Sequence, residues 1–555
     1  MDPLDHLCLG QPKFPQTAVA SPSAATTLDA WHHAYSTFGA EAPAKVSGDF
    51  AVALRQPDGT TFLAVDRFAI RTLCYRLAGD RLLFAERADA LASHAAELDA
   101  QAIYDYLYFH TIPSPRTVFK DVFRVPPGHY VLFRNGKLTV APYWQPRFEE
   151  QRGRPLAALK SEFLQLVESA VAECVVDGPC GCFMSGGTDS STVAGMIGKV
   201  SGQPAESYSI GFDASGYDEM EYARIAARHF GTHHHEYYVT PDDLVSGIPQ
   251  VASHYDQPFG NSSAVPAYYC ARLAKADGIA KMLGGDGGDE LFGGNTRYAK
   301  QCVFGAYDVV PRALRKGLIE PILVDSGRFD SLPLISKAAS YVRQARVPMP
   351  DRMETYNLIE RLGIAEVLSS AFLEHVDTAE PLRQERTIYD QCDAGSLVND
   401  MLAFDWRYTL AENDLPKVCG TADLAGIALG FPFLDGRLVD FSSRLPTNYK
   451  VRGLKLRWFF KEALRGFLPD EIITKKKQGF GLPFGVWAVR HARLGQLASS
   501  SVRQLAERGL VRPEFVEQLL TVHLPAHPGY YGEMVWILMM LEQWLQAKAP
   551  AWKVG

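Results

Sequence analysis

The chain has 555 residues, of which 47% are hydrophobic and 21% charged, as expected for an ordinary globular protein with two or more domains. Its formal net charge of -7 gives no electrostatic reason to expect a nucleic-acid partner. The N-terminal stretch lacks the basic and apolar regions of a signal peptide, and no apolar run is long enough to span a bilayer. Nine scattered cysteines without zinc-type spacing indicate free thiols in a reducing compartment, so we expect a cytoplasmic protein without a membrane span.

Short strands and hairpin turns characterise the first part of the chain. Alternating apolar residues flank Pro57-Asp58-Gly59 and Asn135-Gly136, and both turns are typical of β-hairpins. The predicted strands are residues 50–55, 60–65, 73–76, 81–84, 130–133 and 137–140. A helix is predicted over 85–95, whereas residues 1 to about 45 carry little pattern. We therefore predict a small, mostly β domain over residues 1–147.

Strands and helices alternate between residues 150 and 300, which predicts a parallel sheet with crossover helices. The predicted strands are residues 180–184, 206–212, 234–239 and 279–283, and the predicted helices are 156–174, 218–230, 242–254, 264–276 and one that ends near Gly202. Residues 300–550 are mainly helical in pattern. We therefore predict an α/β domain with a helical C-terminal part over residues 148–549.

The first strand of this domain runs directly into a glycine turn and a helix, with the sequence Ser185-Gly186-Gly187-Thr188-Asp189-Ser190. Two adjacent glycines let backbone N–H groups approach an anion, and a helix N-terminus adds further N–H groups and partial positive charge. The hydroxyl groups are additional donors, whereas an aspartate beside a phosphate requires a divalent cation between them. An ordinary βα turn also contains Gly and Ser, but the Asp and Ser that follow favour a phosphate-binding loop.

The fourth predicted strand ends in a second glycine-rich stretch, residues 284–294, in which six of eleven residues are glycine and three are acidic. Glycines permit close backbone approach to a ligand, and carboxylates hold magnesium or act as bases. Ligands of open parallel sheets bind beyond the carboxyl ends of the strands. Both glycine stretches follow such ends, so we expect them to form one site.

Four stretches of the predicted α/β domain and three of the predicted β domain resemble parts of a known family. The Ser185–Ser190 loop resembles the pyrophosphate loop of the ATP-pyrophosphatase superfamily, and residues 284–294 resemble the signature of the asparagine synthetase family, as do Pro432–Asp435 and Lys475–Gly481. The stretches that resemble the later part of the family's glutaminase domain are 48–54, 66–71 and 125–130. The resemblance covers roughly residues 45–545. It implies an adenine nucleotide alpha hydrolase-like ATP-pyrophosphatase domain preceded by a degenerate N-terminal-nucleophile-type domain.

The resemblance also implies roles for individual residues, with ATP and Mg²⁺ as the cofactors. The residues that it places against ATP are Met184, Ser185, Gly186, Gly187, Asp189, Ser190, Ile210, Gly284 and Gly285. Asp189 and Asp289 match the family's magnesium ligands, and Lys477 matches a lysine that reaches the reacting phosphates. Asp286 is the candidate base or amine-positioning group, and a second magnesium ligand or a turn-capping role is the alternative.

Two departures from the family pattern bear on the substrate. The family's glutaminase nucleophile is a cysteine exposed as residue 1, but Met1 is followed here by Asp2, and the first cysteine is Cys8. We therefore expect no glutamine hydrolysis and a structural role for the first domain. Gly420, Ala428 and Gly430 replace charged residues of the family's amino-acid pocket, and the loss of an arginine removes a bidentate clamp for a carboxylate.

These departures favour an ATP-dependent carbon–nitrogen ligase that forms an intramolecular amide, such as a lasso-peptide macrolactam cyclase or a β-lactam synthetase. Asp286 counts against a β-lactam synthetase, since those enzymes carry tyrosine there. The expected partners are a carboxylate substrate such as a precursor peptide, and a peptidase or leader-binding protein. The alternatives are an asparagine synthetase that uses aspartate and ammonia, and a non-catalytic scaffold, against which the joint presence of Ser185, Asp189, Asp286, Asp289 and Lys477 argues.

Overall fold

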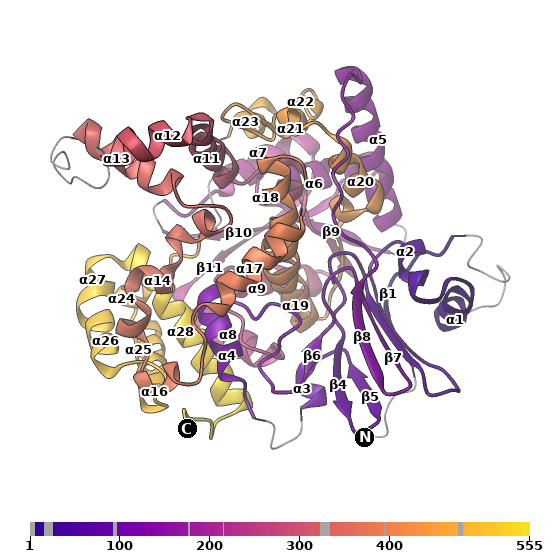
Figure 1. Ribbon diagram of the computed structural model, residues 1–555. Coiled ribbons are helices and arrows are strands. Elements are labelled where there is room, and N and C mark those ends of the chain that lie inside the picture. The colour runs from indigo at the N-terminus through magenta and orange to yellow at the C-terminus, as the bar shows by residue number, and fades with distance from the viewer. Residues whose placement is uncertain are drawn as a thin grey trace.

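The computed structural model describes residues 6–15, 26–92, 97–175, 178–214, 216–321, 333–392, 394–475 and 481–555. A β-rich N-terminal domain lies against a parallel sheet that is covered by helices, and a large helical C-terminal part completes the molecule (Figure 1). The predicted α/β class, with a parallel sheet, a helical C-terminal part and a small β domain in front, is confirmed.

The N-terminal domain consists of two antiparallel sheets with a shared apolar core. The first sheet has the order β1-β2-β3-β7-β8, formed by His6–Gly10, Phe50–Arg55, Thr61–Val65, His129–Arg134 and Lys137–Pro142. The second has the order β5-β4-β6, formed by Arg81–Ala85, Cys74–Ala78 and Phe123–Arg124. Leu63 and Val65 of the first sheet belong to the same buried cluster as Tyr75 and Phe84 of the second. Both predicted hairpins are confirmed.

Three local features differ from the sequence expectation. The helix predicted over 85–95 is wrong at its start, because β5 runs to Ala85 and pairs with β4, and helix α3 covers only Ala88–Leu91. Residues 1 to about 45 contain β1 and helix α1 (Thr27–Phe38), whose capping box joins Thr26 and Asp29. Helix α4 (Ala100–Phe109) was not predicted, because tyrosines make both of its faces apolar and blur the helical period.

The five strands of the central sheet are all parallel and have the order β11-β10-β9-β12-β13. They are His233–Val239, Glu206–Phe212, Cys180–Phe183, Lys281–Leu283 and Ala428–Gly430 in that order. Helix α5 (Leu156–Val175) precedes β9, and the helices that connect the strands from β9 to β12 are α6 (Thr188–Ser201), α7 (Met220–Phe230), α8 (Pro241–His254) and α9 (Ala264–Ala276). The four predicted strands are confirmed, and β13 is a fifth that joins the sheet edge from a distant part of the chain.

This strand order creates a switch point beside the central strand. From β9 the chain moves to β10 and β11 on one side, and it then returns to place β12 on the other side of β9. Helices that follow β9 and β12 therefore diverge and leave a crevice at the carboxyl ends of these two strands. The two glycine-rich stretches leave the sheet at this crevice.

The C-terminal part connects both domains. Residues 397–425 form one continuous helical run, made of α18 (Leu397–Asp405), the π-helical segment η7 (Trp406–Asp414) and α19 (Leu415–Ala425). The long α28 (Pro528–Lys548) shares a buried cluster with α4, and Tyr106 donates a hydrogen bond to the Ile537 carbonyl at 2.8 Å. Further helices are α10 (Gly288–Phe292), α11 (Thr296–Gly305), α13 (Pro333–Ala345), α17 (Glu380–Gln391), α20 (Gly436–Arg444), α22 (Trp458–Ala463), α23 (Asp470–Thr474), α24 (Phe484–Arg490), α25 (Ala492–Glu507) and α26 (Pro513–Gln518). Within the described ranges, no helix combines the length and apolar character that a bilayer crossing requires.

Candidate active site

A pocket of about 320 Å³ opens at the switch point of the parallel sheet. Nine of the residues that the sequence placed at the site line it, namely Met184, Ser185, Gly187, Asp189, Ser190, Ile210, Gly285, Asp286 and Asp289. Gly186 and Gly284 do not line the pocket. They form the backbone behind it, where the Gly284 N–H donates to the Gly430 carbonyl at 2.9 Å.

The loop after β9 is shaped by close backbone contact and by its own serines. Gly186 has a φ of +68°, and a Cβ there would lie 2.6 Å from the Tyr222 Cβ, so glycine is required on both grounds. The Ser185 N–H donates to Ser190 Oγ at 3.1 Å, and the two hydroxyl groups lie 3.1 Å apart. Helix α6 begins at Thr188 and directs its N-terminal N–H groups toward the loop. This arrangement suits a phosphate group.

The loop after β12 lies directly against the first loop because its glycines have no side chains. A Cβ on Gly285 would come within 2.9 Å of the Ser190 nitrogen, and one on Gly288 would collide with the Asp189 carboxylate. Helix α10 then begins at Gly288 and carries Asp289 in its first turn. The glycines of this stretch therefore bring carboxylates from two separate βα units together.

Asp189 and Asp289 meet at one guanidinium group. Arg457 Nη1 lies 2.9 Å from Asp289 Oδ1 and donates to Thr188 Oγ1 at 2.8 Å, and Arg457 Nη2 pairs with Asp189. The side chain of Arg457 is 9% exposed, whereas those of Asp189 and Asp289 are 19% and 25% exposed. Two partly exposed carboxylates within the width of one guanidinium supply the oxygen ligands that Mg²⁺ prefers, so the residues fit a magnesium ion.

A second charged group lies on another wall of the same pocket. Lys417 Nζ forms an ion pair with Asp414 Oδ1 at 2.9 Å, and both residues line the pocket together with Asp286. Burial raises the pKa of Asp286 to about 6; the charge of Lys417 opposes this shift and that of Asp414 adds to it. Burial acts against the charge of Lys417, but the carboxylates of Asp414 and Asp286 outweigh it and raise the pKa of Lys417. Lys417 is therefore cationic at neutral pH.

The sequence did not identify Arg457, Lys417 or Asp414 as site residues. Arg457 lies 268 positions from Asp189, and no pattern near it indicates a ligand. Asp414 and Lys417 had a weak signal, because opposite charges three apart on a helix face the same side. Lys477, predicted as a catalytic residue, lies outside the described residues.

The stretch that departs from the family pattern forms α19 and β13. A Cβ on Gly420 would lie 2.5 Å from the Tyr255 ring, so the tyrosine fills the space beside this backbone. Tyr255 Oη donates to the carbonyls of Pro416 and Lys417 at 3.1 Å each and so fixes the turn of α19 that carries Lys417. Among the described residues that line the pocket, Lys417 is the single cation.

Cys8, the first cysteine of the N-terminal domain, lies in apolar surroundings. Cys8 lies in the middle of β1, opposite Val52, and packs beside the cluster that contains Trp31. Burial raises the pKa of its thiol to about 11. A thiol in this state is a poor nucleophile at neutral pH.

The fold and the site define an α/β domain of the ATP-pyrophosphatase type joined to a glutaminase-type β domain. The family described as Asparagine synthase matches residues 162–546, and the Glutamine amidotransferase domain matches residues 23–144. The chain belongs to the asparagine synthase family, whose members are ATP-dependent carbon–nitrogen ligases.

The relatives match most of this chain, at a sequence identity of 24–25%. Asparagine synthetase [glutamine-hydrolyzing] 1 of Bacillus subtilis (strain 168) is 24% identical over 524 residues, which cover 92% of this chain and 79% of that protein. A putative asparagine synthetase [glutamine-hydrolyzing] of Mycobacterium tuberculosis (strain ATCC 25618 / H37Rv) is 25% identical over 554 residues, with coverage of 93% and 78%. Amidase chry2 of Gibberella zeae is 24% identical over 520 residues, with coverage of 84% and 74%.

Proposed function

We propose that the protein uses ATP to activate a carboxylate of a peptide and joins it to an amine of the same molecule. The product would be a macrolactam, as made by a lasso-peptide cyclase, or another natural-product lactam. A precursor peptide is then the substrate, and a peptidase or leader-binding protein is the expected partner. ATP and Mg²⁺ are the cofactors, in keeping with the cytoplasmic location expected from the sequence.

The pocket provides groups for both cofactors. A carboxylate does not react with an amine at neutral pH, and bound ATP supplies AMP as a leaving group while pyrophosphate is released. Ser185, Gly187 and Ser190 would hold the pyrophosphate part against the start of α6. Asp189 and Asp289 would hold the magnesium ion, which neutralises charge on the phosphates. Arg457 pairs with both carboxylates through its guanidinium group and so fixes their separation.

Asp286 is the group suited to the amine half of the reaction. An amine reacts only after its ammonium form has lost a proton, so a base beside the reacting carbon increases the rate. With its pKa raised to about 6, Asp286 is ionised at neutral pH and still basic enough to accept that proton. Lys417 and Asp414 position the carboxylate and balance its charge. This assignment makes Lys417 a positioning residue.

One observation carries the choice of substrate: the described lining of the pocket contains a single cation, Lys417, and this cation is already paired with Asp414. Free aspartate carries a second carboxylate that needs a cationic partner of its own. A carboxylate within a peptide chain has no such requirement, because its neighbours are neutral amides. Gly420, packed against Tyr255, and the short Ala428 offer no replacement for the missing arginine.

The second candidate is an asparagine synthetase that uses aspartate and ammonia, which is what the names of the bacterial relatives favour. The third candidate, a non-catalytic scaffold, is disfavoured because Asp189, Asp286, Asp289 and Lys417 line one pocket, and a protein that performs no reaction gains nothing from the cost of bringing these charges together.

A pyrophosphate-release assay with ATP and Mg²⁺ separates these candidates. We expect release with a mixed library of linear peptides that contain Asp or Glu, and mass spectrometry should find peptides that have lost one water. Release with aspartate and ammonia alone, together with asparagine formation, would instead establish the second candidate. No release under either condition would favour the scaffold.

A further inference from the structure

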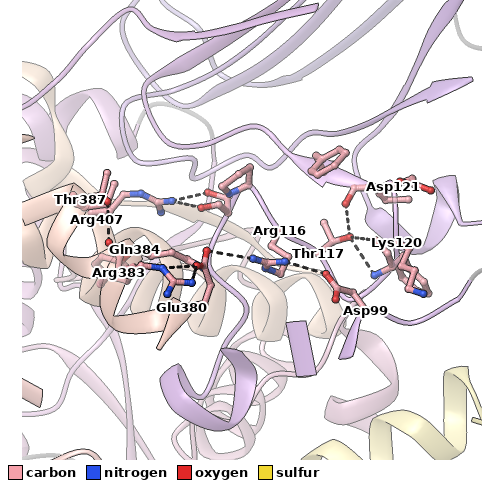
Figure 2. Close-up of a pocket in the computed structure, with 17 residues that line it drawn as sticks. Asp99, Arg116, Thr117, Lys120, Asp121, Glu380, Arg383, Gln384, Thr387 and Arg407 are labelled. Atoms are coloured by element: carbon pink, nitrogen blue, oxygen red, sulfur yellow. Dashed lines mark hydrogen bonds and ion pairs between the residues drawn. The ribbon is translucent and has the colours of Figure 1, made fainter. Parts of the chain in front are cut away.

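A second cavity, of about 710 Å³, lies away from the switch point, in the seam between the two domains (Figure 2). One wall is the loop of residues 114–123 from the N-terminal domain, and the other is α17 with Arg407 and Tyr408 of η7. Its volume is more than twice the 320 Å³ of the pocket at the switch point, which we call the nucleotide pocket, and falls in the range of ligand sites. We call it the seam cavity.

The seam cavity exists only while the two domains are docked. Ser114 Oγ donates to Glu412 Oε1 at 2.6 Å, and Arg407, which pairs with Glu412, donates to Ser114 Oγ at 3.0 Å. The side chains of Arg407 and Glu412 are 15% and 3% exposed, so this contact is a buried one. An N-terminal domain with a poorly nucleophilic Cys8 therefore still contributes a wall that the rest of the chain cannot form alone.

The charges along the seam cavity are balanced rather than uniform. Figure 2 shows Arg116 between Glu380 and Asp99, at 3.7 Å and 3.2 Å, and Arg383 pairs with Glu380 at 2.7 Å. A polyanion such as a nucleotide would find every one of these cations already neutralised. The remaining lining is mixed: Phe123 and Ile388 are apolar, whereas Gln384 and Thr387 are polar. Alternating donors, acceptors and apolar surface suit a peptide backbone with apolar side chains.

The same helical run lines the seam cavity and the nucleotide pocket. Arg407 and Tyr408 line the seam cavity, and Asp414 and Lys417, further along the run, line the nucleotide pocket. Asp414 lies seven positions after Arg407, about 10 Å along a helix at about 1.5 Å per residue. Three extended residues span that distance at about 3.3 Å per residue. The spacing of the two linings along the run is therefore within the length of one short peptide.

We propose that the seam cavity binds an apolar, extended segment of the peptide whose carboxylate is activated in the nucleotide pocket, at least three residues from that carboxylate. This inference rests on the proposed function, because it assigns the second subsite of the same substrate. It gives the N-terminal domain a role in substrate recognition in place of glutamine hydrolysis.

Thr387 is the position best suited to a test. It lines the seam cavity from α17, is exposed, and its hydroxyl bonds only within its own helix, to the Arg383 carbonyl at 2.8 Å. T387W would fill the cavity without breaking an ion pair. D390W changes an exposed residue of the same helix outside the cavity and is the matched control. F123S removes apolar surface from the opposite wall, where Phe123 is 41% exposed.

The probe is a displayed library of random dodecapeptides that each contain one Asp or Glu, selected on the intact wild-type protein with ATP and Mg²⁺. We expect enriched peptides to bind T387W and F123S at least about tenfold more weakly than the wild type and D390W. Equal affinity for all four proteins, or no enrichment, would overturn the subsite. The proposed function has a separate test. Enriched peptides that bind but release no pyrophosphate would refute the proposed function. Peptides that release pyrophosphate equally with T387W and the wild type would refute only the subsite.

Discussion

The two domains use aspartates for different purposes. In the N-terminal domain, Asp66 is 2% exposed and accepts hydrogen bonds from the backbone N–H groups of Phe50, Phe68, Ile70 and Arg71 at 3.0–3.2 Å. In the synthetase domain, Asp189 and Asp289 instead face a guanidinium at the edge of a pocket. The first carboxylate fixes a turn, and the other two line the pocket while they are paired with Arg457. The same side chain thus serves structure where backbone N–H groups surround it, and it lines a pocket where a side-chain cation pairs with it.

The largest effect should come from the paired aspartates. D289N removes one of the two charges that would hold magnesium, so we expect pyrophosphate release to fall by about a thousandfold or more. D189N should behave alike. The control is D440N, which changes an aspartate that is 61% exposed on α20. Activity in D289N within tenfold of the wild type would show that the carboxylate pair holds no metal.

Asp286 should give the next largest effect and a diagnostic pH profile. Because burial raises its pKa to about 6, the basic form predominates above that pH, and the wild-type amide-forming rate should rise with pH and level off above about pH 6. We expect D286N to lower this rate by about a hundredfold to ten-thousandfold and to remove the rise. Pyrophosphate exchange, which needs no base for the amine, should change much less. An unchanged profile in D286N would assign the rise to another group.

Loss of the structural aspartate should affect stability and not chemistry. D66A leaves four N–H groups, two buried and two partly buried, without their acceptor, so we expect the free energy of unfolding to fall by about 3 kcal/mol or more. D66N keeps one acceptor oxygen and should lose less. Denaturant unfolding measures both values, and pyrophosphate release per folded molecule should stay near that of the wild type. A loss of turnover in folded D66N would place Asp66 in the reaction.

The smallest effect is expected for the first cysteine. The Cys8 thiol is half-buried in β1 with a pKa raised to about 11, so C8A should alter pyrophosphate release by less than about twofold. Added glutamine should not be consumed by either protein. Glutamate production that depends on Cys8 would restore a catalytic role to the N-terminal domain and remove the contrast between the two domains.

Much of the fold follows from local patterns. Each predicted strand of the parallel sheet is confirmed because an apolar run between turn residues has few alternative structures. The elements that were missed are short or lack a period. β13 has three residues and joins the sheet through pairing with β12, and α4 is apolar on both faces because it is buried among the C-terminal helices. These elements form because they pack against parts of the chain that are far away in sequence, so the local sequence alone does not predict them.

The same division holds for the site. The sequence alone determined the two glycine loops and their carboxylates, because a strand, a glycine turn and a helix start are encoded within a dozen neighbouring residues. Only the tertiary structure decided that Arg457 lies between Asp189 and Asp289 and that Lys417 shares a wall with Asp286. These residues are more than a hundred positions apart in the chain. The long-range packing that brings them together produces no local sequence pattern from which it could be predicted.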